Sequence, residues 1–275
     1  MLNVHILTDN RTTRSDILTE HGLSLWIEKD EQRILFDTGQ SAIYCKNAAT
    51  MGVNLADTDF ILLSHGHFDH CGGLEFFPEK EKAPQLHVHP DLFAKKYALR
   101  EDGQMRYIGP TWALNSLSWL QDRVIYNTLN SQPLPGIMLS GEIPRVTDFE
   151  DIPGYFHVEK DGQVIRDLFV DEQMLVIEEK GGIAVFLGCS HPGVINCVQY
   201  AQKLFPGKDI LMLIGGMHLE NAGLERLKLT IRHLLEMNVQ RVIPLHCTGA
   251  SEIMALKRHL GERCLICSAG DTIKI

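Results

Sequence analysis

Four potential metal ligands stand within six consecutive residues: His65, His67, Asp69 and His70. They follow the apolar run 59–63, which predicts a buried strand that ends just before His65. A polar cluster at the end of a buried strand needs partners, and imidazole and carboxylate groups are common metal ligands. The alternate spacing lets His65 and His67 bind one ion, and Asp69 and His70 then face a second. The sequence therefore predicts a two-metal site that activates a water molecule.

Three more histidines follow predicted buried strands. His191 comes after the run 183–187, His218 after the run 210–214, and His246 after the run 241–245. We expect His191 and His246 to be further metal ligands, because each lies at a strand end beside small residues. An imidazole at His218 can contact a substrate or give a proton to a leaving group, or it can simply bind a neighbouring carbonyl group at its strand end.

The elements around these residues follow one plan twice. Residues 23–27 and 33–36 predict a hairpin, followed by a helix over 41–51 and a strand over 59–63. Residues 174–177 and 183–187 likewise predict a hairpin, followed by a helix over 194–204 and a strand over 210–214. Further helices are expected near 224–237 and 251–260, and a buried strand over 265–267. This repetition predicts two mixed sheets packed face to face with helices outside, an α/β fold with a four-layer αββα arrangement. The site is then expected where strand ends from both halves meet.

The middle of the chain, residues 83–171, interrupts this plan. It predicts a strand over 86–89, a helix over 91–99, and loops rich in proline and glycine. Its aromatic residues fit either a lid over a substrate or an anchor that fixes the insertion to the core. We expect residues 1–275 to be one domain that carries this insertion.

Composition and charge limit the classes of function. Hydrophobic residues make up 44% of the 275 residues and charged residues 22%, which is ordinary for a globular protein. The formal net charge of -9, without a basic stretch, argues against a nucleic-acid partner and against nuclease activity. We expect no signal peptide, no membrane span and a cytoplasmic location, to which seven scattered cysteines are suited. The expected partner is a small-molecule substrate, and a homodimer is the default assembly.

The His-x-His-x-Asp-His string resembles the signature of the metallo-β-lactamase superfamily. The segment 35–39 with Asp37 resembles the upstream strand of that family, whose aspartate orients the ligands. The segments 188–193 and 242–249 resemble later strand ends that supply histidines. The resemblance implies that His65, His67 and His191 bind a first metal. It also implies that Asp69, His70 and His246 bind a second, with Asp37 behind them.

One position departs from the family pattern. Many members carry Gly-Asp at the end of this later strand, where the carboxylate bridges the metals, but this chain has Gly188 and Cys189. Either Cys189 binds metal as a thiolate, or it is a small buried residue and His191 takes over part of the role. A thiolate favours zinc, whereas nitrogen and oxygen ligands alone also suit iron and manganese. We expect two divalent ions, with zinc preferred.

Several segments together resemble a narrower group within the superfamily. The segments 140–145, 188–193, 215–219 and 246–249 are similar to metal-dependent hydrolases related to an archaeal dihydropterin-ribofuranosylaminobenzene phosphate synthase. That enzyme transfers a pterin methyl group to an arylamine, so membership does not imply hydrolysis. Arg145, in the first of these segments, either binds a phosphate or carboxylate of the substrate or pairs with a neighbouring acidic residue.

These observations give three hypotheses of function. The leading one is a metal-dependent hydrolase whose metal-held hydroxide attacks an ester, amide or phosphoester, with Asp69 orienting the hydroxide and His218 assisting the leaving group. The second is a pterin-methyl transferase of the synthase type. The third is an iron-dependent redox or sensor protein on the same fold. The metal that the protein binds, and its response to a pterin methyl diphosphate analogue, distinguish them.

Overall fold

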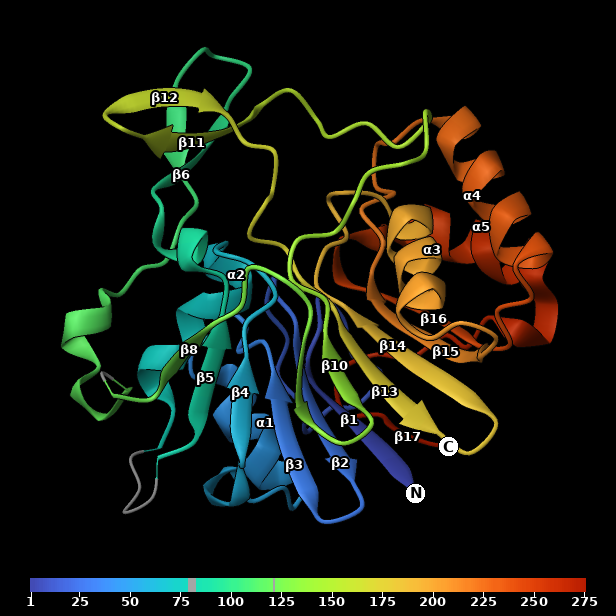
Figure 1. Ribbon diagram of the computed structural model, residues 1–275, viewed down its shortest axis with the longest axis horizontal. Helices are drawn as coiled ribbons and strands as arrows, with labels where there is room; N and C mark the ends of the chain where they lie inside the picture. Colours follow the sequence, from blue (N-terminus) through green and yellow to red (C-terminus); the bar gives the residue numbers. More distant parts are fainter. Residues whose placement is uncertain (79–82, 121) are drawn as a thin grey trace. The chain divides into compact units, whose positions relative to one another are not determined.

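The computed structural model of the chain describes residues 1–78, 83–120 and 122–275. It contains two compact units, the first made of Met1–Thr128, Pro153–Asp171 and Ser268–Ile275, and the second of Leu129–Ile152 and Glu172–Cys267. Each unit is built on its own mixed sheet, and Figure 1 labels most of the strands. The sequence predicts that residues 1–275 form one domain. Whether these two units fold as one domain stays a prediction.

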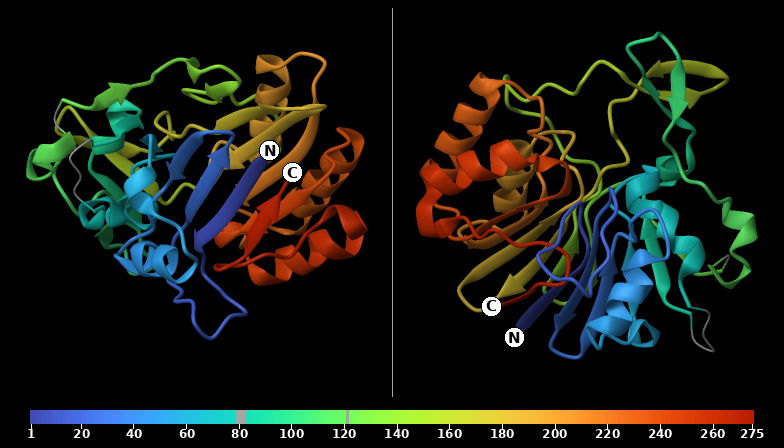
Figure 2. Two further views of the ribbon diagram at one scale, coloured as in Figure 1. Left: turned by 90° about the horizontal axis from the view of Figure 1, so that it is seen from below. Right: turned by 180° about the vertical axis from the view of Figure 1, so that it is seen from behind.

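The first unit contains a seven-stranded sheet in the order β17-β1-β2-β3-β4-β5-β8. Its strands are β1 (Leu2–Thr8), β2 (Ser24–Lys29), β3 (Gln32–Phe36), β4 (Phe60–Leu62), β5 (Gln85–Val88), β8 (Val124–Tyr126) and β17 (Thr272–Lys274). The strands from β17 to β3 are antiparallel, and those from β3 to β8 are parallel. The last strand pairs with the first, so the two chain ends lie side by side (Figure 2).

Helix α1 (Ile43–Thr50) packs its apolar face on this sheet. Tyr44 and Ala48 of the helix share a core cluster with Leu7, Trp26 and Leu35 of the strands. The parallel pair β3 and β4 flanks this helix in the sequence, and α2 (Phe68–Cys71) follows β4. The carboxyl ends of β3 and β4 therefore lie at one edge of the sheet, which is where the predicted site residues of this unit begin.

The second unit contains a six-stranded sheet in the order β16-β15-β14-β13-β10-β9. Its strands are β9 (Ser131–Leu134), β10 (Ile137–Leu139), β13 (Leu175–Glu179), β14 (Gly182–Leu187), β15 (Asp209–Gly216) and β16 (Val242–Leu245). Its helices are α3 (Val194–Leu204), α4 (Leu224–Glu236) and α5 (Ala250–Leu260). The helices share a core cluster with Ile183, Val185 and Leu187, the alternate residues of β14 that point to one face.

The repeated plan that the sequence predicts is present in both units. In the first, the antiparallel pair β2 and β3 is followed by α1 and by β4, which is parallel to β3. In the second, the antiparallel pair β13 and β14 is followed by α3 and by β15, which is parallel to β14. Each hairpin, helix and parallel strand therefore brings two strand ends to the same edge of its sheet.

Two predicted elements are wrong. The helix expected over 91–99 is a short 3₁₀ helix, Pro90–Phe93, followed by strand β6 (Lys96–Leu99). This segment pairs with β11 (Phe156–Lys160), about 60 residues away in the sequence. The buried strand expected over 265–267 is irregular, and Ile266 is 47% exposed. Within the segment 83–171, β5 and β8 belong to the seven-stranded sheet and β9 and β10 to the six-stranded sheet, and its role as an insertion or lid stays a prediction.

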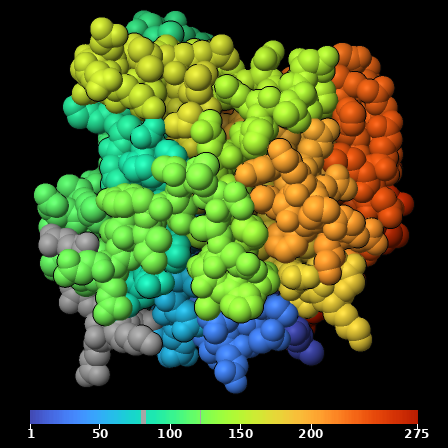
Figure 3. Space-filling model, viewed as in Figure 1, coloured from blue at the N-terminus to red at the C-terminus, as the bar shows by residue number. Residues whose placement is uncertain are grey.

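A third, four-stranded sheet belongs to the first unit, in the order β12-β11-β6-β7. Its strands are β6 (Lys96–Leu99), β7 (Met105–Tyr107), β11 (Phe156–Lys160) and β12 (Gln163–Arg166). Strand β12 is exposed along its whole length, and its hairpin with β11, yellow in Figure 3, lies on the surface. The remaining 3₁₀ helices are Leu55–Asp57, Gly72–Phe76, Leu114–Ser116, Ser118–Leu120, His246–Thr248 and Gly261–Arg263. Among the residues described, no helix has the length and apolar character that crossing a membrane requires.

A buried histidine in β5 gives the first unit a pH-dependent stability. Burial lowers the pKa of His87 from 6.5 to about 4, so between these values the unfolded chain binds a proton that the folded chain does not. Stability should therefore fall as pH drops from 6.5 towards 4, by up to about 1.4 kcal/mol per pH unit. Urea unfolding across this range should show a flatter dependence for His87→Gln. The same change at exposed His259 should leave the slope unaltered, and an unchanged slope in His87→Gln would contradict the prediction.

Candidate metal centre

The loop and short helix after β4 bring together the predicted ligands of the first unit. His65 and His67 stand in the loop, and Asp69 and His70 in α2. The side chains are buried, and the His65 ring centroid lies 4.6 Å from that of His67 and 4.3 Å from that of His70. Three imidazole rings thus converge at the carboxyl end of a buried strand, as the sequence predicted.

Asp37 holds this cluster from behind. It follows β3 with a backbone φ of 56°, and its side chain is fully buried. One carboxylate oxygen accepts a hydrogen bond from the Ser64 backbone N–H at 2.7 Å, and the other lies 2.7 Å from both Ser64 Oγ and His70 Nδ1. Because Nδ1 of His70 faces the carboxylate, Nε2 is the nitrogen that it can offer to a metal.

The electrostatics of this loop favour neutral imidazole at His65. Burial, together with the charges of His70 and His67, holds the pKa of His65 well below 6.5. Neutral imidazole is the form that binds metal. Ser64 Oγ lies 2.9 Å from His65 Nδ1, so a chain of contacts runs from Asp37 through Ser64 to the first histidine.

A residue that the sequence analysis did not single out, His21, lies beside Asp69. His21 Nε2 is 3.2 Å from Asp69 Oδ2, and His70 Nε2 is 3.8 Å from the same oxygen. The His21 side chain is 57% exposed, whereas that of Asp69 is nearly buried. Nothing in the sequence marks His21, because it precedes β2 in an irregular segment far from the histidine string.

In the second unit, a carboxylate holds His191 much as Asp37 holds His70. Glu172 Oε2 accepts a hydrogen bond from the His191 backbone N–H at 2.9 Å and lies 2.7 Å from His191 Nδ1. Both side chains are 1% exposed. His191 can therefore offer Nε2 to a metal. The sequence analysis missed Glu172, an acidic residue three positions before the start of β13, because nothing in its local sequence sets it apart.

Glu150 fixes the start of α3, the helix that follows the loop with His191. The buried carboxylate of Glu150 accepts hydrogen bonds from the backbone N–H groups of Ile195 and Asn196, both at 2.9 Å. Gly193 packs directly on this carboxylate with a φ of 113°, a conformation and a space that other residues do not fit. Burial raises the pKa of Glu150 above its usual value, although the two backbone donors act in the opposite direction.

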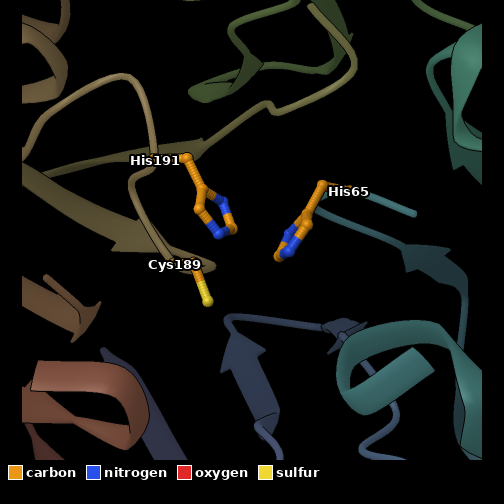
Figure 4. Close-up of side chains that lie close together, drawn as sticks. All are labelled: His65, Cys189 and His191. Atoms are coloured by element: carbon orange, nitrogen blue, oxygen red, sulfur yellow. The ribbon is translucent and has the colours of Figure 1, made fainter. Parts of the chain in front are cut away.

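Cys189 lies with the other predicted ligands of the second unit. Its Sγ is within 4.8 Å of a ring nitrogen of His191 and within 4.8 Å of a ring nitrogen of His246. Figure 4 shows Cys189 and His191 on the loop after β14, and His65 at the end of β4. Cys189 is buried, so it satisfies the geometry of a ligand and also that of a small packed residue.

The structure places the two remaining site residues differently. His218 follows β15 with a φ of 43°, and its ring centroid is 4.6 Å from that of His191. Arg145 is exposed, and among the described residues it makes no ion pair. The next two backbone N–H groups, at Val146 and Thr147, both donate to Asn196 Oδ1. His218 is therefore brought to a predicted ligand, and no contact ties Arg145 to one.

The donor set fits a divalent transition metal. Imidazole nitrogens with a carboxylate suit zinc, iron and manganese, and a thiolate would add a preference for zinc. Within each unit, a buried carboxylate binds Nδ1 of a predicted ligand histidine, which is the arrangement that fixes the tautomer of histidines bound to metals. The residues therefore have the chemistry of a site for a divalent metal.

Comparison with known proteins identifies the family. The family model of the metallo-beta-lactamase superfamily matches residues 19–195. Among curated proteins, the chain is 32% identical over 263 residues to a 7,8-dihydropterin-6-methyl-4-(beta-D-ribofuranosyl)-aminobenzene-5'-phosphate synthase of Methanocaldococcus jannaschii, covering 90% of this chain and 88% of the synthase. An uncharacterized protein of the same organism is also 32% identical, over 258 residues, covering 93% of this chain and 94% of that protein.

Solved structures show the same fold. A crystal structure described as a metal-dependent hydrolase of the beta-lactamase superfamily matches with a TM-score of 0.87 and 29% identity, over 100% of this chain and 99% of that one. Zinc-bound PqqB from Methylobacterium extorquens matches with a TM-score of 0.59 and 15% identity, over 99% of this chain and 100% of that one. The fold class predicted from the sequence is thereby confirmed. The chain belongs to the metallo-β-lactamase superfamily.

Proposed function

We propose that this protein is a metal-dependent enzyme that hydrolyses an ester, amide or phosphoester of a small molecule. The observation that carries the proposal is the buried carboxylate on Nδ1 of His70 and the matching one on Nδ1 of His191. Such pairs present Nε2 to a metal and make the ring a better ligand. A histidine that only fills space in a core does not require a buried acidic partner, which costs free energy to desolvate.

The proposed ligand set follows the family pattern. His65, His67 and His191 would hold a first divalent ion, and Asp69, His70 and His246 a second. Cys189 stands where many members carry the bridging aspartate, and its Sγ is near His191 and His246. We assign Cys189 a place beside the ions, as a thiolate ligand or as a packed residue, and the metal content of a Cys189→Ser protein decides between these roles.

The residues of the chain would contribute in different ways. When bound, the metal pair supplies a Lewis acid that lowers the pKa of water towards about 7. Asp69 would orient the attacking water, and His218 would give a proton to the leaving group from its imidazole. Asp37 and Glu172 would keep His70 and His191 in one tautomer. Arg145, which is exposed and makes no ion pair among the described residues, is the proposed contact for a phosphate or carboxylate of the substrate.

The first test is elemental analysis of the protein purified without added metal. We expect about two equivalents of one divalent metal per chain, with zinc preferred. Zinc or manganese would direct assays to hydrolysis or group transfer, and iron would favour the redox hypothesis instead. Less than about one-tenth of an equivalent of every metal, persisting after reconstitution, would overturn the proposal.

A second candidate is transfer of a pterin methyl group. It is favoured by the similarity to the archaeal synthase, which spans 90% of this chain. Incubation with a pterin methyl diphosphate analogue and an arylamine separates the two reactions. Formation of a carbon–nitrogen bond with release of diphosphate supports transfer, whereas turnover of simple ester probes without the arylamine supports hydrolysis.

A further inference from the structure

A lysine is buried at the start of the four-stranded sheet. Lys96, the first residue of β6, has a side chain that is 1% exposed. Its Nζ lies 2.7 Å from Asp167 Oδ2 and 2.9 Å from Asp171 Oδ1. Although burial lowers the pKa of Lys96, the charges of Asp171 and Asp167 raise it above its usual value. Lys96 is thus held as a cation by two carboxylates, and removing these charges from water costs free energy that their mutual attraction must offset.

Asp171 connects this charge cluster to the loop of predicted ligands. Its second oxygen, Oδ2, accepts a hydrogen bond from the Gly66 backbone N–H at 2.8 Å. Gly66 is the single residue between His65 and His67. On the other side Gly66 packs on the carbonyl oxygen of Leu92, which a Cβ at this position would overlap. The backbone between the two histidines is thus held from both sides.

The segment between the two carboxylates also contacts both histidines. The Phe169 ring centroid is 5.3 Å from that of His67 and 6.4 Å from that of His65. Its backbone has a φ of 53°, which is costly for an aromatic residue, and Asp167 Oδ1 holds it by accepting from the Phe169 backbone N–H at 2.8 Å. Lys96 Nζ lies 5.4 Å from the centroid of the same ring.

We propose that Lys96 and Asp171 are positioning residues that hold the Gly66 backbone so that His65 and His67 are arranged for metal binding before the metal arrives. This inference rests on the proposed metal site. Among the described residues neither side chain makes a hydrogen bond or ion pair with a predicted ligand. Asp171 acts on them through the Gly66 backbone, and Lys96 holds Asp171 in place. Their contribution should appear as metal affinity, because a loop that is already ordered loses less conformational entropy when it binds.

The chain offers a closely matched control for Asp171. Asp167 and Asp171 are both buried, both accept from Lys96 Nζ, and each accepts from one backbone N–H group. Only Asp171 binds the backbone of the ligand loop. Asp171→Ala and Asp167→Ala each remove one contact with Lys96 and one with a backbone N–H group. The first releases Gly66, between the two histidines, whereas the second releases Phe169, which reaches them only by ring packing.

Zinc affinity by chelator competition, together with urea unfolding of the metal-free proteins, tests the inference. We expect comparable losses of unfolding free energy in the two variants, but a zinc affinity about tenfold lower in Asp171→Ala than in Asp167→Ala. Should Asp171→Ala not yield folded protein, Asp171→Asn and Asp167→Asn provide the same comparison with little change of shape.

The outcomes are distinct. Equal zinc affinities in the two variants, with zinc bound by the unaltered protein, would overturn the positioning role and leave the proposed function standing. If Lys96→Met lowers the zinc affinity as much as Asp171→Ala does, the positioning role is supported, because removing the lysine releases the Asp171 carboxylate. Failure of the unaltered protein to bind zinc, iron or manganese would overturn the proposed function and this inference together.

Discussion

The His246→Ala protein is expected to lose at least one equivalent of metal and about a thousandfold in turnover. His246 is buried at the end of β16, and we propose it as a ligand of the second ion. Stabilisation of a transition state by a metal is worth several kcal/mol, and each ~1.4 kcal/mol corresponds to a factor of ten in rate. Elemental analysis and turnover of whichever ester or phosphoester probe the unaltered protein cleaves provide the two measurements.

Two further variants make this result specific. His246 has a φ of 49°, so His246→Asn checks that any loss is not caused by the backbone, because asparagine tolerates this region better than alanine. His259→Ala removes an exposed histidine from α5 of the same unit and should retain metal and turnover. Full metal content and full turnover in His246→Ala would exclude His246 from the site. Full metal content and full turnover in His67→Ala would likewise exclude His67 from the site.

The second large effect is expected from Asp37→Asn. The substitution keeps the shape of the side chain and tolerates the left-handed backbone. Its amide NH₂ group, however, must face a donor, either the Ser64 N–H or the side that binds Ser64 Oγ and His70 Nδ1. Leaving a buried donor unsatisfied costs about 1–3 kcal/mol. Releasing a ligand histidine from its carboxylate lowers metal affinity about tenfold to hundredfold. Urea unfolding of the metal-free protein and chelator competition measure the two effects separately.

Asp59→Asn is the matched control for Asp37→Asn. Asp59 directly precedes β4 in the first unit, and its Oδ2 accepts from the Arg33 backbone N–H at 2.8 Å, but it is exposed. We expect its metal affinity to equal that of the unaltered protein. If Asp37→Asn were as stable and bound zinc as tightly as this control, Asp37 would have no part in orienting His70.

The sequence was sufficient where local signals coincide. His65 and His70 lie in one string directly after an apolar run, so strand β4 and the position of the ligands could be predicted together. Helix α3 begins and ends at the residues expected, because its apolar period is regular and Pro192 and Gly193 precede it. His191 and His246 were predicted as ligands for a related reason, since His246 directly follows β16 and His191 lies four residues after the end of β14.

Apart from Asp37, which the family resemblance supplied, the carboxylates that bind the predicted ligands and their loop could not be predicted in the same way. Asp171 and Lys96 are 75 residues apart, and Glu172 precedes His191 by 19 residues. Their proximity depends on which strands pair, and no periodic pattern specifies that. The error over 91–99 has the same origin: Lys96 begins a strand only because β11 supplies the hydrogen bonds for it. In this segment, pairing with the distant strand β11 outweighs the local preference for a helix.

The pairing of the last strand with the first has a consequence for synthesis on the ribosome. Strand β1 sits between β2 and β17, and the segment Ser268–Ile275 belongs to the first unit. A nascent chain therefore carries β1 as an open edge until residues 268–275 have emerged, long after the histidine string has been made. An open edge invites pairing with other chains. A recombinant fragment that stops at residue 171 would carry this edge permanently, so the unit that holds the histidine string is best produced within the whole chain.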